Sequence, residues 1–306
     1  MYKGDFDYIQ QESEVKGLND DIEKYNIDTS YSDIEFRRAR NNYNRITTLL
    51  SQINYKDPDT YKTSKIKFKE LKELLIEILD LIFDKKYHKE IDSYNKDLLQ
   101  LSIEDLKEWD NAVSYYISKD KFITTDIQVS KKLTKIEVPF VAHEYIHVLL
   151  GKFQTLLHRQ VLNNFHYDEL LSIIVEYITS YELDQIDNEH LLDKDNLIRL
   201  NHNKSNIMEY NAAQRLKLVE KFDEETKQDE KYLNHILYQY LICDIYASRI
   251  LDIYKDDKKD VIGSIIAILE GESSIEELKK RYNISLSDMT TRDTYINKLT
   301  NPDWRV

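Results

Sequence analysis

The sequence predicts a mainly α protein with a small β element, and three observations support this fold class. Only 5 Gly and 3 Pro interrupt 306 residues, and so few helix breakers favour long helices with few tight turns. Apolar residues recur at helical spacing over long stretches, most clearly in 60–92 and 232–254. Residues 121–130 instead alternate and are rich in β-branched side chains, which predicts a strand.

The first part of the chain predicts an N-terminal helical cap or hairpin over residues 1–117. Ser102 to Asp105 has the form of a capping box, so a helix is expected to start there. Pro58, between two aspartates, marks a break between earlier segments. The helices predicted in this region cover 5–26, 31–55, 60–92 and 102–118.

The second predicted domain covers residues 118–306 and is helical after its first strand. A strongly amphipathic pattern over 166–183 predicts a helix, and 187–204 has the composition of a loop with a short helix. The other helices predicted in this domain cover 141–162, 208–222, 232–254, 261–271, 274–284 and 288–299.

Composition limits the kinds of partner and location. A net charge of −13 disfavours nucleic acids and anionic membranes, because both reward clustered Lys and Arg. The one cysteine, Cys243, cannot form an intramolecular disulfide, and the N-terminus carries no apolar signal segment. No run reaches the roughly 18 apolar residues of a membrane span. We therefore expect a cytoplasmic protein, and the sequence does not indicate its oligomeric state.

One motif in the chain is typical of metal chemistry. His143, Glu144 and His147 follow the pattern H-E-x-x-H inside an otherwise apolar helix. Residues four apart lie on one face of an α-helix, so both imidazoles can reach the same ion with Glu144 beside it. This arrangement is typical of zinc metallopeptidases. The alternative is a chance arrangement on a core helix, and a third ligand downstream would argue against it.

The third ligand is expected on the helix predicted over 166–183. Four residues there could serve: His166, Asp168, Glu169 and Glu176. We select Glu169, because apolar neighbours would bury this acid and a metal would compensate its charge. Glu176 is better placed to hold an imidazole N–H, with Ser172 on the same side. The alternative for each acid is a surface carboxylate on an amphipathic helix.

Two further features have open interpretations. The strand at 121–130 could present an edge on which a peptide substrate adds as another strand, or it could be a buried linker. His235, Tyr238 and Tyr240 lie on the predicted helix 232–254, where aromatic residues usually form core. A phenol or imidazole that faces zinc can instead donate a hydrogen bond to the oxyanion of a tetrahedral intermediate.

Three blocks together resemble the thimet oligopeptidase and oligoendopeptidase F family, which are zinc metallopeptidases of the gluzincin type. They occur in the family's order: VPFVAHEYIHVL, YDELLSIIVEY and HILYQYLICDIYAS. The chain departs from the family at Ile146, where the family usually has glycine. It also departs at Leu233, the position that corresponds to the family's second catalytic tyrosine; the nearest tyrosine in this chain is Tyr232, one position away. The spacing from His147 to Glu169 is a few residues shorter than usual.

The resemblance covers roughly 121–298 and implies a shortened, zincin-like helical body with its active site in a groove. It implies that zinc is bound by three residues and that Glu144 is the general base on a zinc-bound water. It also implies that Tyr240, or next Tyr238, assists the carbonyl. The implied zinc ligands are His143, His147 and Glu169. The implied function is zinc-dependent endopeptidase hydrolysis of short unfolded oligopeptides. The alternative is a catalytically inactive peptide-binding or interaction protein on the same scaffold.

Overall fold

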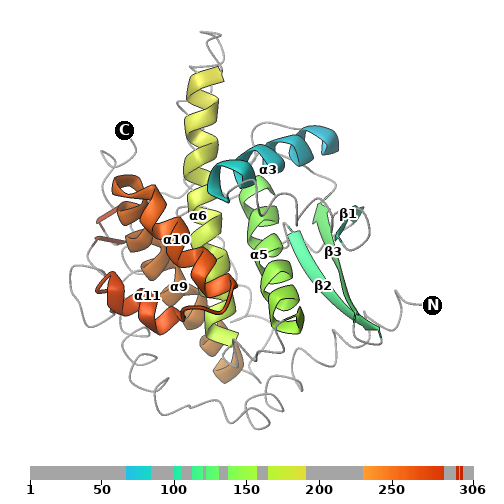
Figure 1. Cartoon of the computed structure of the whole chain (residues 1–306). Helices are drawn as coiled ribbons and strands as arrows, with labels where there is room; N and C mark the ends of the chain where they lie inside the picture. Colours follow the sequence, from blue (N-terminus) through green and yellow to red (C-terminus); the bar gives the residue numbers. More distant parts are fainter. Residues whose placement is uncertain are drawn as a thin grey trace.

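The computed structural model describes residues 67–83, 99–104, 112–119, 122–130, 137–156, 165–190, 230–285, 294–295 and 297–298. These parts of the chain are mainly helical, as predicted (Figure 1). In chain order the elements are α3 (Phe68–Ile82), β1 (Leu99–Glu104), β2 (Ala112–Lys119), β3 (Phe122–Ser130), α5 (Glu137–Leu156), α6 (Phe165–His190), α9 (Glu230–Asp256), α10 (Lys258–Leu269) and α11 (Ile275–Arg281).

The three strands form one sheet in the order β1-β3-β2. β3 coincides with the strand predicted over 121–130, and it pairs in parallel with β1 and antiparallel with β2. β3 is therefore the central strand, so the interpretation of residues 121–130 as an open edge for a peptide is wrong. Both sides of its backbone are already hydrogen-bonded within the sheet.

The helix predicted over 102–118 is also wrong, because β1 ends at Glu104 and β2 occupies 112–119. The sequence of β2, AVSYYISK, mixes β-branched and aromatic residues that suit a pleated strand. Pairing with β3 overrides the local capping signal at Ser102. The domain boundary predicted between residues 117 and 118 falls within β2. The division into two domains stays a prediction.

The functional region depends on the packing of α5, α6 and α9. α6 packs against α5 and also against α9, while β2 and β3 lie against α5 (Figure 1). Residues 169–180 of α6 are all buried, although the sequence predicted an amphipathic helix there. Because neighbouring helices surround this part of α6, its polar residues are buried together with its apolar ones. A buried polar group needs a partner, and this requirement shapes the site.

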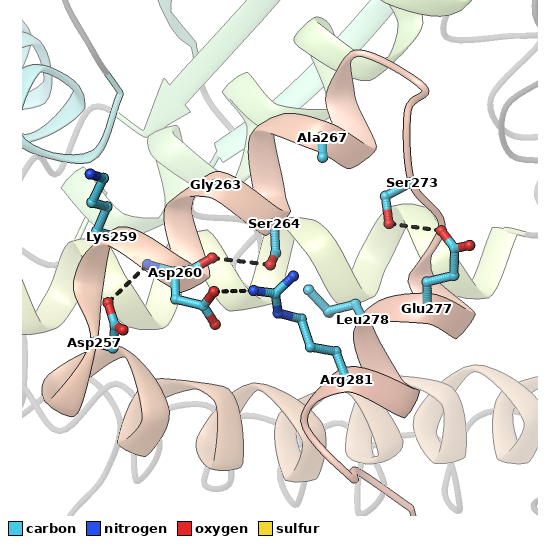
Figure 2. A pocket seen from close by; sticks show the side chains of 10 residues that line it. All are labelled: Asp257, Lys259, Asp260, Gly263, Ser264, Ala267, Ser273, Glu277, Leu278 and Arg281. Carbon is cyan, nitrogen blue, oxygen red and sulfur yellow. Dashed lines mark hydrogen bonds and ion pairs between the residues drawn. The ribbon is translucent and has the colours of Figure 1, made fainter.

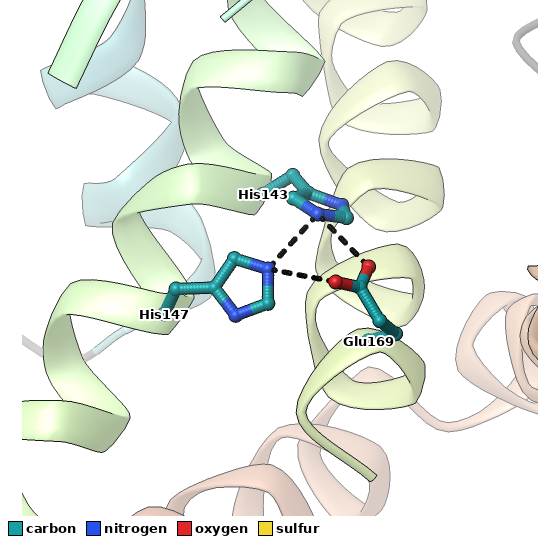
Figure 3. A group of neighbouring side chains, drawn as sticks. All are labelled: His143, His147 and Glu169. Carbon is teal, nitrogen blue, oxygen red and sulfur yellow. Dashed lines mark hydrogen bonds and ion pairs between the residues drawn. The ribbon is translucent and has the colours of Figure 1, made fainter. Parts of the chain in front are cut away.

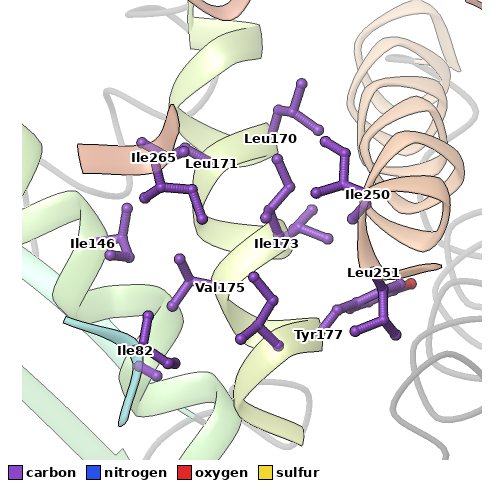
Figure 4. Close-up of a cluster of buried hydrophobic side chains, with 14 of the residues drawn as sticks. Ile82, Ile146, Leu170, Leu171, Ile173, Val175, Tyr177, Ile250, Leu251 and Ile265 are labelled. Atoms are coloured by element: carbon purple, nitrogen blue, oxygen red, sulfur yellow. The ribbon is translucent and has the colours of Figure 1, made fainter. Parts of the chain in front are cut away.

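Apolar side chains from α3, α5, α6, α9, α10 and α11 form one core cluster, part of which is drawn in Figure 4. α3 has the stripe that the sequence predicted: its buried leucines and isoleucines recur at helical spacing and face α5 and α6. The labelled members in Figure 4 include Ile82, Ile146, Leu171, Ile250 and Ile265. Across the described ranges, no helix is both long enough and apolar enough to cross a membrane.

The end of the chain contains the short helices that the sequence predicted at 261–271 and 274–284. α10 starts at Asp257, whose side chain accepts a hydrogen bond from the Asp260 amide, and α11 starts with a capping box between Ser274 and Glu277. α6 continues to His190, so the loop predicted from residue 187 begins later. The helices predicted at 5–26, 31–55 and 208–222 lie outside the described residues.

Candidate metal centre

Three of the predicted ligands meet between α5 and α6. His143 and His147 project from successive turns of α5 toward Glu169 on α6 (Figure 3). The two Nε2 atoms lie 3.1 Å apart. Glu169 places Oε2 at 3.5 Å from His143 Nε2 and Oε1 at 3.6 Å from His147 Nε2. The selection of Glu169 from four alternatives therefore agrees with the geometry.

The separations fit a single metal ion. Ligand atoms at zinc–nitrogen and zinc–oxygen distances in a tetrahedral site lie about 3.3 Å from one another. The three measured separations fall close to this value, and the candidate ligand atoms of the group all lie within 4.8 Å of one another. Two imidazoles with one carboxylate suit zinc or another transition metal better than magnesium or calcium, which prefer all-oxygen sites.

Each imidazole contacts a side chain of α6 through its Nδ1 atom, the ring nitrogen that does not face the other candidate ligands. Glu176 Oε2 lies 2.9 Å from His143 Nδ1, and Ser172 Oγ lies 3.4 Å from His147 Nδ1. When the Nδ1–H groups donate to these oxygens, both Nε2 lone pairs point to the space that the ligands share. Glu176 and Ser172 are buried, so these contacts belong to the core. Both residues occupy the supporting positions that the sequence predicted for them.

The two histidines titrate very differently when no metal is bound. Burial lowers the pKa of His143, but hydrogen bonds to Glu169 and Glu176 and the charges of Glu169 and Glu144 outweigh it, so the pKa lies well above its usual value. Burial lowers the pKa of His147 to about 4, against the opposing charge of Glu169. The pKa values of the two imidazoles are therefore shifted in opposite directions, which favours the protonated form of His143 and the neutral form of His147.

Glu144 lies close enough to His143 to raise its pKa by charge. It is half-buried, unlike the more deeply buried Glu169 and Glu176. A general base must lie within hydrogen-bond reach of the proton that it removes, and partial exposure is compatible with access to a water molecule. The role predicted for Glu144 stays a prediction, since no substrate position is defined by these residues alone.

The residues predicted to stabilise an oxyanion lie on α9. Tyr240 is half-buried and packs against the core cluster. Tyr238 and His235 are within the helix, but their side chains lie outside the described part of the structure, as does that of Leu233. The contribution of all three predicted residues to catalysis remains a prediction.

Two polar links between α6 and α9 were not predicted from the sequence. Tyr177 donates a hydrogen bond of 3.0 Å to Asp244, and Tyr254 donates one of 2.8 Å to Glu182. Lys258 also contacts Glu182, at 2.6 Å. An available signal was the position of Asp244, an acid between apolar neighbours on a predicted core helix. Which tyrosine binds it, however, depends on tertiary packing across 67 positions of the sequence.

A hollow of about 710 Å³ lies between α10 and α11, apart from the candidate metal ligands (Figure 2). Four of its charged side chains take part in the structure of this helix pair. Arg281 forms an ion pair with Asp260, Asp257 caps α10, and Glu277 caps α11. The hollow is therefore explained by the capping and pairing of two short helices.

Comparisons of the chain with protein-family models, with curated proteins and with solved structures found no match. The function is therefore inferred from the residues of the site.

Proposed function

We propose that the chain is a zinc-dependent metallopeptidase that hydrolyses peptide bonds in short unfolded oligopeptides. The observation that carries the proposal is the convergence of His143 Nε2, His147 Nε2 and Glu169 at separations that suit one tetrahedral ion. Three protein ligands leave a fourth position for a reactant, which is typical of catalytic rather than structural zinc.

The charge of the site also supports a cation. Glu169 and Glu176 are buried, and Glu144 lies near the same histidine. Three carboxyl groups thus share with two imidazoles a region that is largely shielded from water, and each ionised carboxylate would place a negative charge there. Burying such charge is costly unless a cation compensates it. A divalent ion would neutralise the group more completely than a single proton does.

The residues around the ligands have distinct proposed tasks. A zinc ion in this group supplies Lewis-acid chemistry, which lowers the pKa of water and polarises a carbonyl. Glu144 takes a proton on its carboxylate as water attacks the scissile carbonyl carbon, and it then delivers this proton to the leaving amine nitrogen. Glu176 and Ser172 keep the rings of His143 and His147 oriented.

Tyr240 is the residue that we propose for stabilising the developing negative charge on the carbonyl oxygen. A phenol hydroxyl that donates a hydrogen bond to this oxygen lowers the barrier, because the bond is stronger in the transition state than in the substrate. Tyr238 and His235 are the other residues proposed for this task from the sequence.

The test uses a quenched-fluorescent peptide pool and metal analysis of the full-length protein. Wild type is expected to contain one zinc per chain and to cleave peptides, with loss of activity on chelation. Glu144→Gln should retain the zinc and lose hydrolysis, because the amide cannot accept the proton. Retained turnover in Glu144→Gln would refute the proposed mechanism. Zinc without any hydrolysis by wild type would favour the non-catalytic peptide-binding protein.

A further inference from the structure

The hydrogen bond between Tyr177 and Asp244 lies close in sequence to two residues of the proposed active site, Glu176 on α6 and Tyr240 on α9. Tyr177 follows Glu176 directly on α6, and Asp244 lies one helical turn after Tyr240 on α9. Both side chains are fully buried, and their contact is 3.0 Å. A buried carboxylate is costly to retain, so its hydrogen bond to a specific phenol calls for a reason beyond packing.

The two links between α6 and α9 define the relative direction of these helices. Tyr177 pairs with Asp244, and the later residue Glu182 pairs with the later residue Tyr254. α6 and α9 therefore run in the same direction. The first half of α9, which carries Tyr240, accordingly lies toward the N-terminal end of α6, which carries Glu169.

The helical phase then separates the three α9 residues. Asp244 faces α6, because it accepts the hydrogen bond from Tyr177. At 100° per residue, position 240 lies about 40° around α9 from position 244, whereas positions 238 and 235 lie about 120° and about 180° away. Position 240 thus shares the α6-facing side of α9, and position 235 is on the opposite side.

We infer that Tyr177 and Asp244 are positioning residues, whose hydrogen bond sets α9 against α6 so that Tyr240, rather than Tyr238 or His235, faces the metal group. This inference rests on the proposed metal site. Tyr254 and Glu182 form a matched control, since they join the same two helices through the same chemistry but lie farther along both helices from the site. Loss of either link removes one buried hydrogen bond, and only the first is next to Tyr240.

The test measures how close residue 240 lies to Co²⁺ bound at the site. 3-Fluorotyrosine is incorporated at position 240 alone, or at 238 alone, in the full-length chain, and the fluorine relaxation caused by Co²⁺ is recorded. Because this effect falls steeply with distance, relaxation at 240 is expected to exceed that at 238. Tyr177→Phe should reduce it several-fold at 240, while Tyr254→Phe should leave it at the wild-type value.

Several results would overturn the inference. One is stronger relaxation at 238 than at 240 in the wild-type chain, and this comparison decides even if Tyr177→Phe does not fold. Another is an unchanged signal in Tyr177→Phe, or an equal fall in both variants, which indicates general loosening. Failure of every protein to take up Co²⁺ overturns the proposed metal site and the inference together. Co²⁺ uptake with any of the other contrary results overturns the inference alone.

Discussion

Glu176 on α6 holds the ring of His143 on α5 through a 2.9 Å contact between Oε2 and Nδ1. The other nitrogen of the same ring faces His147 and Glu169, so one imidazole joins the carboxylate that supports it to the proposed metal position. The affinity of the proposed metal site would therefore depend on a residue that is not one of its ligands.

Replacement of Glu176 by Ala is expected to weaken zinc binding by about 10- to 100-fold, because the His143 ring loses its orientation and its tautomer preference. Glu176→Gln keeps an acceptor oxygen and should lose less. Ser172→Ala should have the smallest effect of the three, since its contact with His147 is longer, at 3.4 Å. Competition with a chromophoric chelator measures the affinities. Equal affinities in Glu176→Ala and wild type would contradict this role.

Replacement of Glu169 by Ala should remove stoichiometric zinc, because two imidazoles alone bind the ion too weakly to retain it during purification. Glu182→Gln is the control: Glu182 is also a buried acid on α6, but it bonds to Tyr254 and Lys258. This variant should keep one zinc per chain. Elemental analysis of both proteins gives the result, and full zinc occupancy in Glu169→Ala would exclude Glu169 as a ligand.

Zinc binding at pH 7 should release about one proton per ion, because ligands must be deprotonated and the raised pKa of His143 favours its protonated form before the metal binds. His147, with its pKa lowered to about 4, is already neutral. The apparent affinity should therefore fall as the pH decreases below neutrality. Calorimetric titrations in buffers with different ionisation enthalpies count the protons. Release of none would mean that His143 is neutral before the metal binds.

Ile146 occupies the position where the oligopeptidase family that the chain resembles usually has glycine. Its side chain is fully buried in the core cluster. Ile146→Gly should lower the free energy of unfolding by about 3–6 kcal/mol, through a cavity and a poorer helix former. Ile146→Val should lower it by only about 0.5–1.5 kcal/mol. Urea denaturation measures both. A cost below that of the valine variant would show that the position tolerates glycine.

The sequence predicted the proximity of His143, His147 and Glu169 better than it predicted the fold around them. The spacing of His143 and His147 is a local property of one helix, and an acid among apolar residues identified Glu169. β2 was mistaken for a helix because its pairing with β3 outweighs a local capping signal. The link between Tyr177 and Asp244 was not predictable, since the relative register of two helices depends on how their surfaces pack.

The burial of α6 determines where the chain can vary. α3 exposes the charged face of a surface helix, so substitutions at exposed residues such as Glu73 and Glu77 leave the core unchanged. Residues 169–180 of α6 offer no such face. Sequence drift in this chain should therefore spare every position of that segment, rather than every third or fourth one, and a designer seeking new surface properties has to work elsewhere.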